Sequence, residues 1–436
     1  MSRFALLFIP ALLAAPAAAE KADVYAVTGA RIVTVSGPPI EKGTVVLRDG
    51  VIEAVGAVPV PADARVIDAA GLTLTPGLID AFGGIGLPAP APRTREGVAS
   101  PSPSPSPAAA LTPEAMALDR IRPPEALKAR DRGITTALVI ARDGVLPGRS
   151  VLLNLAGERA EDMVLRQPAA LHVHMATLTR RYPASLMGTV ALVRQALYDA
   201  ARYREEWAAY ESAPGGKKRP RYDPQLAAWQ DVAAGRLPLV VTASRENDVR
   251  RALALAEEFR IKVAVAGAPQ AFRLAGLIKS RRLPLLVSVN FDPPRATESF
   301  FGFGGIDEEQ QRREIEEATR NPAALEKAGV PFALVSGHAP DFLAGVRKAI
   351  EAGLSREAAL RALTLGAAET LGIADRTGSL APGKMANLVV WSGEPLTKEG
   401  KAKMVFVDGR LYEPEERPDA RREEAEERPT AGEVRP

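Results

Sequence analysis

Cysteine is absent from the 436 residues of this chain, and histidine occurs only three times. Without cysteine the protein has no disulfide, no thiol nucleophile and no thiolate metal site. Aromatic residues make up 5% of the chain, and 53 acidic residues nearly balance 56 basic ones. A chain so balanced, with no basic stripe interleaved with aromatics, is not expected to bind nucleic acid. Its fold must depend on burial of the 46% of residues that are hydrophobic.

Long apolar runs are also missing: after residue 19 no segment reaches about 18 consecutive apolar residues, the minimum for a membrane-spanning helix. Residues 1–19 combine Arg3, a short apolar stretch and Ala17-Ala18-Ala19, the pattern of an export signal with a small-residue cleavage site. An uncleaved helix is the alternative, which the short apolar stretch disfavours. We predict an exported protein, periplasmic or extracellular, that is soluble after the signal is removed.

Strand patterns occupy both ends of the remaining chain. Residues 20–75 and 380–412 are rich in β-branched residues, and hairpin turns are predicted at Asp49-Gly50 and Asp408-Gly409. These two distant segments are candidates for one small composite β-domain.

Residues 76–379 follow a different pattern, in which short apolar runs alternate with helical segments. Continuous apolar runs are typical of strands buried on both faces. Such runs occupy residues 134–140, 150–155, 170–175, 238–242, 262–266, 284–289 and 331–336, and helices are expected over 186–201, 245–259, 269–280 and 307–328. The alternation predicts a parallel sheet, and about eight such units predict a closed (β/α)8 barrel.

Two segments fall outside this organisation. Residues 88–113 contain a Ser-Pro repeat and are predicted to be a mobile, extended insert. Residues 413–436 form a charged, proline-bearing tail that is predicted to be disordered.

Three stretches show a specific similarity in their order and spacing. They are residues 50–56 with 67–80, ending in Pro-Gly-Leu-Ile-Asp; residues 349–364; and residues 371–373 with 378–390. The chain resembles the amidohydrolase superfamily, in particular its imidazolonepropionase-like and dihydroorotase-like group. The resemblance implies an α/β fold, a distorted TIM (β/α)8 barrel with a β-sandwich built from both chain ends. It also implies hydrolysis of carbon–nitrogen bonds, such as those of cyclic amides, by hydroxide on one or two divalent metals, often zinc.

The metal ligands that the resemblance implies are mostly replaced in this chain. The family follows Pro-Gly-Leu-Ile-Asp with His-x-His on strand one, and has histidines on strands five and six and an aspartate on strand eight. The corresponding positions hold Phe82, Gly84, Thr242, Ala266 or Gly267, and Gly337. Only His172, on strand four, is a possible ligand. Because zinc sites need about three or four protein ligands, no cofactor is expected and the catalytic residues are unknown.

The histidines leave one alternative open. In His172-Val173-His174 the two imidazoles lie on one face of a predicted strand, and His338 follows the last barrel strand. These three could form a relocated mononuclear site for zinc or another divalent metal. Asp80, Asp292 and Asp341 are the candidate oxygen ligands. Otherwise each histidine is a core or rim residue, and Asp80 serves to pin the first loop.

The sequence is compatible with three hypotheses about function. One is a working hydrolase with the relocated site, and another is a catalytically lapsed relative, a pseudoenzyme that serves as a binding or partner module. The third is a scaffold for a catalytically competent amidohydrolase relative. Phe82 favours a lapsed protein, because a large apolar ring would fill the place of a metal and its water. Ser185, which precedes an apolar-periodic segment, is predicted to be a helix N-cap rather than a nucleophile.

Overall fold

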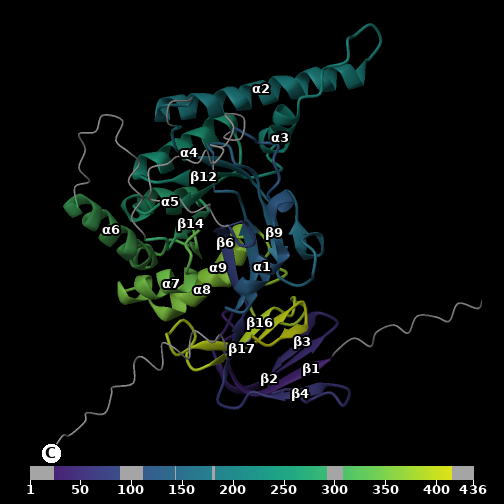
Figure 1. Cartoon of the computed structure of the whole chain (residues 1–436), viewed down its shortest axis with the longest axis vertical. Helices are drawn as coiled ribbons and strands as arrows, with labels where there is room; N and C mark the ends of the chain where they lie inside the picture. The colour runs from purple at the N-terminus through teal and green to yellow at the C-terminus, as the bar shows by residue number, and fades with distance from the viewer. Residues whose placement is uncertain (1–23, 89–110, 143, 179–181, 292–307, 415–436) are drawn as a thin grey trace, which may run out of the picture.

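The structure, a computed structural model, describes residues 24–88, 111–142, 144–178, 182–291 and 308–414 (Figure 1). The predicted export signal, most of the Ser-Pro insert, almost all of the tail and Asp292 lie outside the described residues. Within them, no helix combines the length and the apolar character that crossing a bilayer requires.

An eight-stranded sheet joins the two ends of the chain. Its strands are ordered β18-β17-β16-β5-β1-β2-β3, with β4 beside β1. They are β1 (Tyr25–Ile32), β2 (Ile40–Arg48), β3 (Val51–Gly56), β4 (Arg65–Asp68), β5 (Thr73–Pro76), β16 (Leu388–Ser392), β17 (Lys401–Val407) and β18 (Arg410–Tyr412). Since β16 pairs antiparallel with β5, the distant segments meet as expected. The division of the chain into domains at residues 75 and 380 stays a prediction.

The two predicted hairpin turns are present, and their tips touch. Asp49 and Gly50 have φ angles of 52° and 77°, and Asp408 and Gly409 have 53° and 76°. Positive φ at both central residues is the mark of the type I′ turn, which matches the twist of the flanking strands. A Cβ on Gly409 would lie 2.8 Å from the Gly50 Cα, so the close approach of these two hairpin turns depends on glycine.

The barrel body consists of two sheets that share one apolar interior. Their strand orders are β10-β9-β7-β6 and β15-β14-β13-β12-β11-β8. The strands are β6 (Leu78–Gly83), β7 (Ile134–Val139), β8 (Gly148–Arg149), β9 (Val151–Asn154), β10 (Val164–Arg166), β11 (Leu171–His174), β12 (Leu239–Ala243), β13 (Val263–Gly267), β14 (Leu285–Ser288) and β15 (Ala333–Val335).

The two sheets approach one another at both edges, although their ladders are not continuous. On one side β8 and β9 are consecutive parts of one extended segment. On the other side the Gly337 N–H, just after β15, donates to the Phe82 carbonyl at 3.1 Å. Buried apolar side chains from both sheets fill the space between them, among them Ile79, Leu138, Leu152, Val240, Ala266, Leu286 and Val335. The predicted α/β fold, a distorted barrel with a β-domain from both chain ends, is confirmed.

One barrel strand runs opposite to the prediction. The apolar run at residues 150–155 was expected to be parallel to its neighbours, but β9 is antiparallel to β7 and β8 is antiparallel to β11. A parallel crossover needs about a dozen residues. Only residues 140–147 connect β7 to β8, which is too short. Apolar periodicity reports burial, not strand direction, so the run could not show this.

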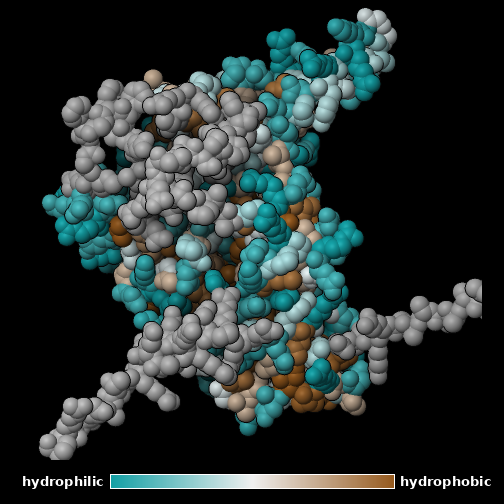
Figure 2. Space-filling model, in the orientation of Figure 1, coloured by the Kyte–Doolittle hydropathy of each residue, from teal (hydrophilic) through white to brown (hydrophobic). Residues whose placement is uncertain are grey.

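Helices occur at the four predicted places; three of them have bounds close to those expected, but the helix expected over 186–201 continues to Ser212. The helices are α1 (Pro123–Arg130), α2 (Leu186–Ser212), α3 (Pro224–Ala233), α4 (Glu246–Phe259), α5 (Ala275–Arg281), α6 (Glu308–Lys327), α7 (Phe342–Glu351), α8 (Arg356–Leu363) and α9 (Leu365–Leu371), with 3-10 turns at Ala117–Arg120, Glu161–Met163 and Ala271–Leu274. Ser185 Oγ accepts from the Gly188 N–H at 3.1 Å, which confirms the predicted N-cap of α2. The outward surfaces of α6 and of the far end of α2 are hydrophilic (Figure 2).

Candidate functional site

The carboxyl ends of the barrel strands gather the residues of the candidate site. Phe82 lies near the end of β6, His172 and His174 lie on β11, and His338 follows β15. In TIM barrels, active sites are built at this end of the strands.

Phe82 occupies the position of the first expected metal ligand and is part of the core. Its side chain is only 4% exposed and packs with the apolar barrel interior. The centroid of its ring lies 5.8 Å from that of His172 and 5.7 Å from that of His338, the latter edge-on at 87°. One apolar ring therefore contacts two of the three imidazoles in the chain.

Gly84 occupies the second expected ligand position, and the His338 ring fills the space beside it. A Cβ on Gly84 would lie 2.8 Å from His338 Cδ2, closer than such atoms approach in proteins. The His338 ring is held there because its Nε2 lies 3.0 Å from the Ile140 carbonyl oxygen. No side chain of any length fits at residue 84 unless this ring moves.

The positions on strands five, six and eight are also without metal ligands. Ala266 on β13 is fully buried and offers only a methyl group. Thr242 on β12 faces His174 across the ladder, and its Oγ1 is buried without a hydrogen-bond partner in the described structure. A Cβ on Gly337 would lie 2.1 Å from Ser288 Oγ, so an aspartate would not fit there.

His172 is a buried, neutral imidazole. Its side chain is 0% exposed, and neither ring nitrogen has a hydrogen-bond partner among the described residues. Burial, reinforced by repulsion from His174 and His338, holds the pKa of His172 well below its ordinary value of 6.5. A neutral imidazole is the form that binds metals, but one ligand does not make a metal site.

The three histidines do not form a ligand set in this structure. Across the described segments, no group of three or more His, Cys, Asp or Glu side chains is placed to hold a metal ion. Asp341, a candidate oxygen ligand, caps α7 instead, since its Oδ1 accepts from the Ala344 N–H at 3.0 Å. The residues present therefore do not fit the divalent metal that the fold family implies, and binding by His172, His174 and His338 stays a prediction.

Asp80 connects the first and last barrel strands. It is fully buried; its Oδ1 accepts from the Ser336 N–H at 2.9 Å, and its Oδ2 accepts from the Ser336 hydroxyl at 2.6 Å. Burial raises the pKa of Asp80 above 3.8, although these hydrogen bonds oppose the rise. Gly83 makes room for the pair, because a Cβ there would lie 2.2 Å from Asp80 Oδ2. Asp80 therefore has a structural role, but it joins β6 to the end of β15 instead of pinning the first loop, and nothing in the sequence pointed to Ser336 as its partner.

Comparison with known proteins identifies relatives of this chain. The model of the amidohydrolase family matches residues 299–412. The amidohydrolase tasK of Hapsidospora irregularis is 24% identical over 411 residues, an alignment that covers 84% of this chain. The same alignment covers only 39% of that relative's length.

Solved structures share the fold over nearly the whole chain. An amidohydrolase from Thermotoga maritima MSB8 superposes with a TM-score of 0.76 at 24% identity, covering 89% of this chain and 99% of that one. The ochratoxinase of A. niger has a TM-score of 0.53 at 15% identity and covers 90% of this chain and 96% of its own. The family match over residues 299–412, the curated relative and the shared architecture agree that this chain is similar to members of the amidohydrolase superfamily.

Proposed function

We propose that this protein is a catalytically lapsed amidohydrolase, a pseudoenzyme whose barrel serves as a binding or partner module. One observation carries the proposal: Phe82 and Gly84 stand where the first two metal ligands would be, and both places are closed by packing. The Phe82 ring is buried against His172, and the His338 ring lies where a side chain on residue 84 would begin.

The chemistry of the donor set supports a lapsed site. A catalytic zinc takes three protein ligands and leaves one position for water. Here the side chains at the strand-one, strand-six and strand-eight positions have no atom that could bind a metal, and Thr242 offers only a neutral hydroxyl. An apolar ring in the same space also disfavours a hydroxide, because a buried charge without compensation is costly.

The proposed partner is a catalytically competent amidohydrolase relative, and the proposed location is periplasmic or extracellular. The signal-like pattern of residues 1–19 supports export.

A second candidate is a hydrolase acting on carbon–nitrogen bonds through a relocated site at His172, His174 and His338. It is favoured by the buried ring nitrogens of His172, which have no partner among the described residues. A buried polar group without a partner is rare in folded proteins and points to something that binds it.

Metal content distinguishes the two candidates. We expect elemental analysis of the purified mature protein to find no stoichiometric transition metal. Metal near one equivalent that disappears in a His172→Leu variant would establish the relocated site instead.

The double variant Phe82→His with Gly84→His tests whether the replacements at residues 82 and 84 alone account for the proposed loss of metal binding. It should not take up zinc tightly in isothermal titration, because the strand-six and strand-eight positions still have no ligand atom, Thr242 offers only a neutral hydroxyl, and a histidine at residue 84 would meet the His338 ring. Phe82→Leu with Gly84→Ser is the matched control, since it makes similar steric changes without imidazoles. Tight zinc uptake by the histidine variant but not by the control would contradict the proposal.

A further inference from the structure

Helix α2 extends past the barrel and forms an arm with the loop that follows it. The helix has 27 residues, and its buried residues end at Tyr203: Thr189, Val193, Leu197, Ala200 and Tyr203. Beyond Tyr203 no residue of α2 is fully buried. Figure 1 shows the end of α2 and the loop to α3 reaching beyond the rest of the molecule.

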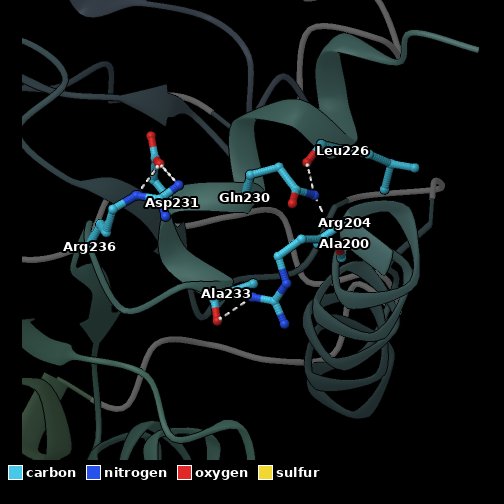
Figure 3. A network of polar contacts seen from close by, with 7 residues as sticks. All are labelled: Ala200, Arg204, Leu226, Gln230, Asp231, Ala233 and Arg236. Atoms are coloured by element: carbon cyan, nitrogen blue, oxygen red, sulfur yellow. Dashed lines mark hydrogen bonds and ion pairs between the residues drawn. The ribbon is translucent and has the colours of Figure 1, made fainter. Parts of the chain in front are cut away.

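Helix α3 braces the arm (Figure 3). The Gln230 side chain donates from Nε2 to the Ala200 carbonyl at 2.9 Å, and Arg204 donates from Nη1 to the Ala233 carbonyl at 3.2 Å. The Asp223 N–H donates to the Tyr203 hydroxyl at 3.2 Å. These contacts between side chain and main chain hold the two helices together, so the arm is a supported projection.

The loop at the end of the arm folds back on α2. Lys217 donates from Nζ to the Ala209 carbonyl at 2.6 Å, and the Arg219 guanidinium lies 5.6 Å from the centroid of the Trp207 ring. Trp207 in turn meets Tyr210 edge-on at 6.4 Å. Cation–π and aromatic contacts of this kind fix the position of the loop relative to the helix.

The end of the arm concentrates positive charge. We call Lys217, Lys218, Arg219, Arg221 and Tyr222 the basic tip. The basic tip carries four positive charges, whereas the net charge of the whole chain is only +3. In the part of the chain that the structure describes, none of the four makes an ion pair.

The acidic residues that flank the basic tip do little to neutralise it. Between Glu211 and Asp223 the chain has no Asp or Glu. The Asp223 carboxylate is already engaged as the N-cap of α3, where it accepts from two main-chain N–H groups. Tyr222 is 67% exposed at the same place.

We propose that the basic tip docks on an anionic lipid surface. Lysine and arginine near such a surface gain favourable energy from charge that is spread over many headgroups, and tyrosine is favoured at the boundary between water and lipid. A projecting cationic tip can reach an extended charged surface without the barrel being in the way. This binding is independent of whether the barrel is catalytically lapsed.

Vesicle sedimentation tests the proposal with the full chain. The protein should sediment with vesicles of phosphatidylglycerol and phosphatidylcholine at low salt, and binding should weaken as salt rises. Each cation near the surface contributes about fivefold to the partition coefficient, so Lys218→Gln with Arg221→Gln should lower it by about 30-fold. Both residues are exposed, so circular dichroism should show an unchanged fold.

The matched control is Arg312→Gln with Lys327→Gln. These exposed residues of α6 give the same change in net charge, away from the arm (Figure 1). The control should bind vesicles like the wild type. The proposal is overturned if the wild type stays in the supernatant, sediments equally with pure phosphatidylcholine, or loses as much binding in the control as in the tip variant.

Discussion

Replacing His172 with leucine should stabilise the protein. The imidazole is 0% exposed and both of its nitrogens lack hydrogen-bond partners among the described residues. A buried polar group left unpaired costs about 1–3 kcal/mol of folding free energy. Leucine is of similar size, and swaps that conserve volume usually cost less than about 1.5 kcal/mol. We therefore expect His172→Leu to raise the free energy of unfolding by about 1–2 kcal/mol near neutral pH.

The difference in the free energy of unfolding between His172→Leu and the wild type should increase as the pH falls. Burial lowers the pKa of His172 in the folded protein well below 6.5, whereas the unfolded chain titrates near 6.5. Below that pH the unfolded state binds a proton that the native state does not, so the wild type loses stability with a slope approaching about 1.4 kcal/mol per pH unit. Leucine removes this linkage. Between about pH 6.5 and about pH 5 the advantage of the variant should grow by up to about 2 kcal/mol.

Urea unfolding near neutral pH and near pH 5 measures both effects. His174→Leu is the control on the same face of the same strand, where the side chain is partly exposed and no gain linked to a desolvated nitrogen is expected. If His172→Leu is less stable than the wild type at both pH values, the imidazole has a bound partner and the reasoning about an unpaired ring is wrong.

Two further predictions concern the connection between β6 and β15. Ser336→Ala removes the hydroxyl that donates to Asp80 Oδ2 and should cost about 1–3 kcal/mol. The Ser336 hydroxyl stabilises the ionised form of Asp80, so the loss of folding free energy in Ser336→Ala should grow as the pH rises through the raised pKa of Asp80. Urea unfolding at several pH values measures this loss, and a loss that shrinks with rising pH would contradict the prediction. Gly83→Ala places a Cβ 2.2 Å from Asp80 Oδ2 and 2.4 Å from Ser336 Oγ, and should lower the Tm by overpacking, at a cost of about 1–3 kcal/mol. Gly276→Ala is its control, because nothing lies within 4 Å of the added methyl group, and an equal fall of the Tm in both variants would refute the steric argument.

The amino-acid sequence by itself determined the features that depend on neighbouring residues. Asp49-Gly50 adopts the positive φ angles of a hairpin turn, and Ser185 caps the helix it precedes, because both are local conformational preferences. The apolar runs became barrel strands since burial on both faces is encoded in composition. The missing metal ligands could be read in the same way, because a phenylalanine or a glycine cannot bind a metal in any fold.

Only the tertiary structure decided how distant segments meet. It reversed the direction of residues 150–155, and it paired Asp80 with Ser336, which lies 256 positions away. It also placed the Phe82 ring against His172 and the His338 ring beside Gly84. The two expected metal-ligand positions, residues 82 and 84, therefore lack a ligand and also have no room for a metal ion. The physical reason is that side-chain packing depends on atoms brought together from separate strands, and local patterns in a sequence carry no information about which strands those are.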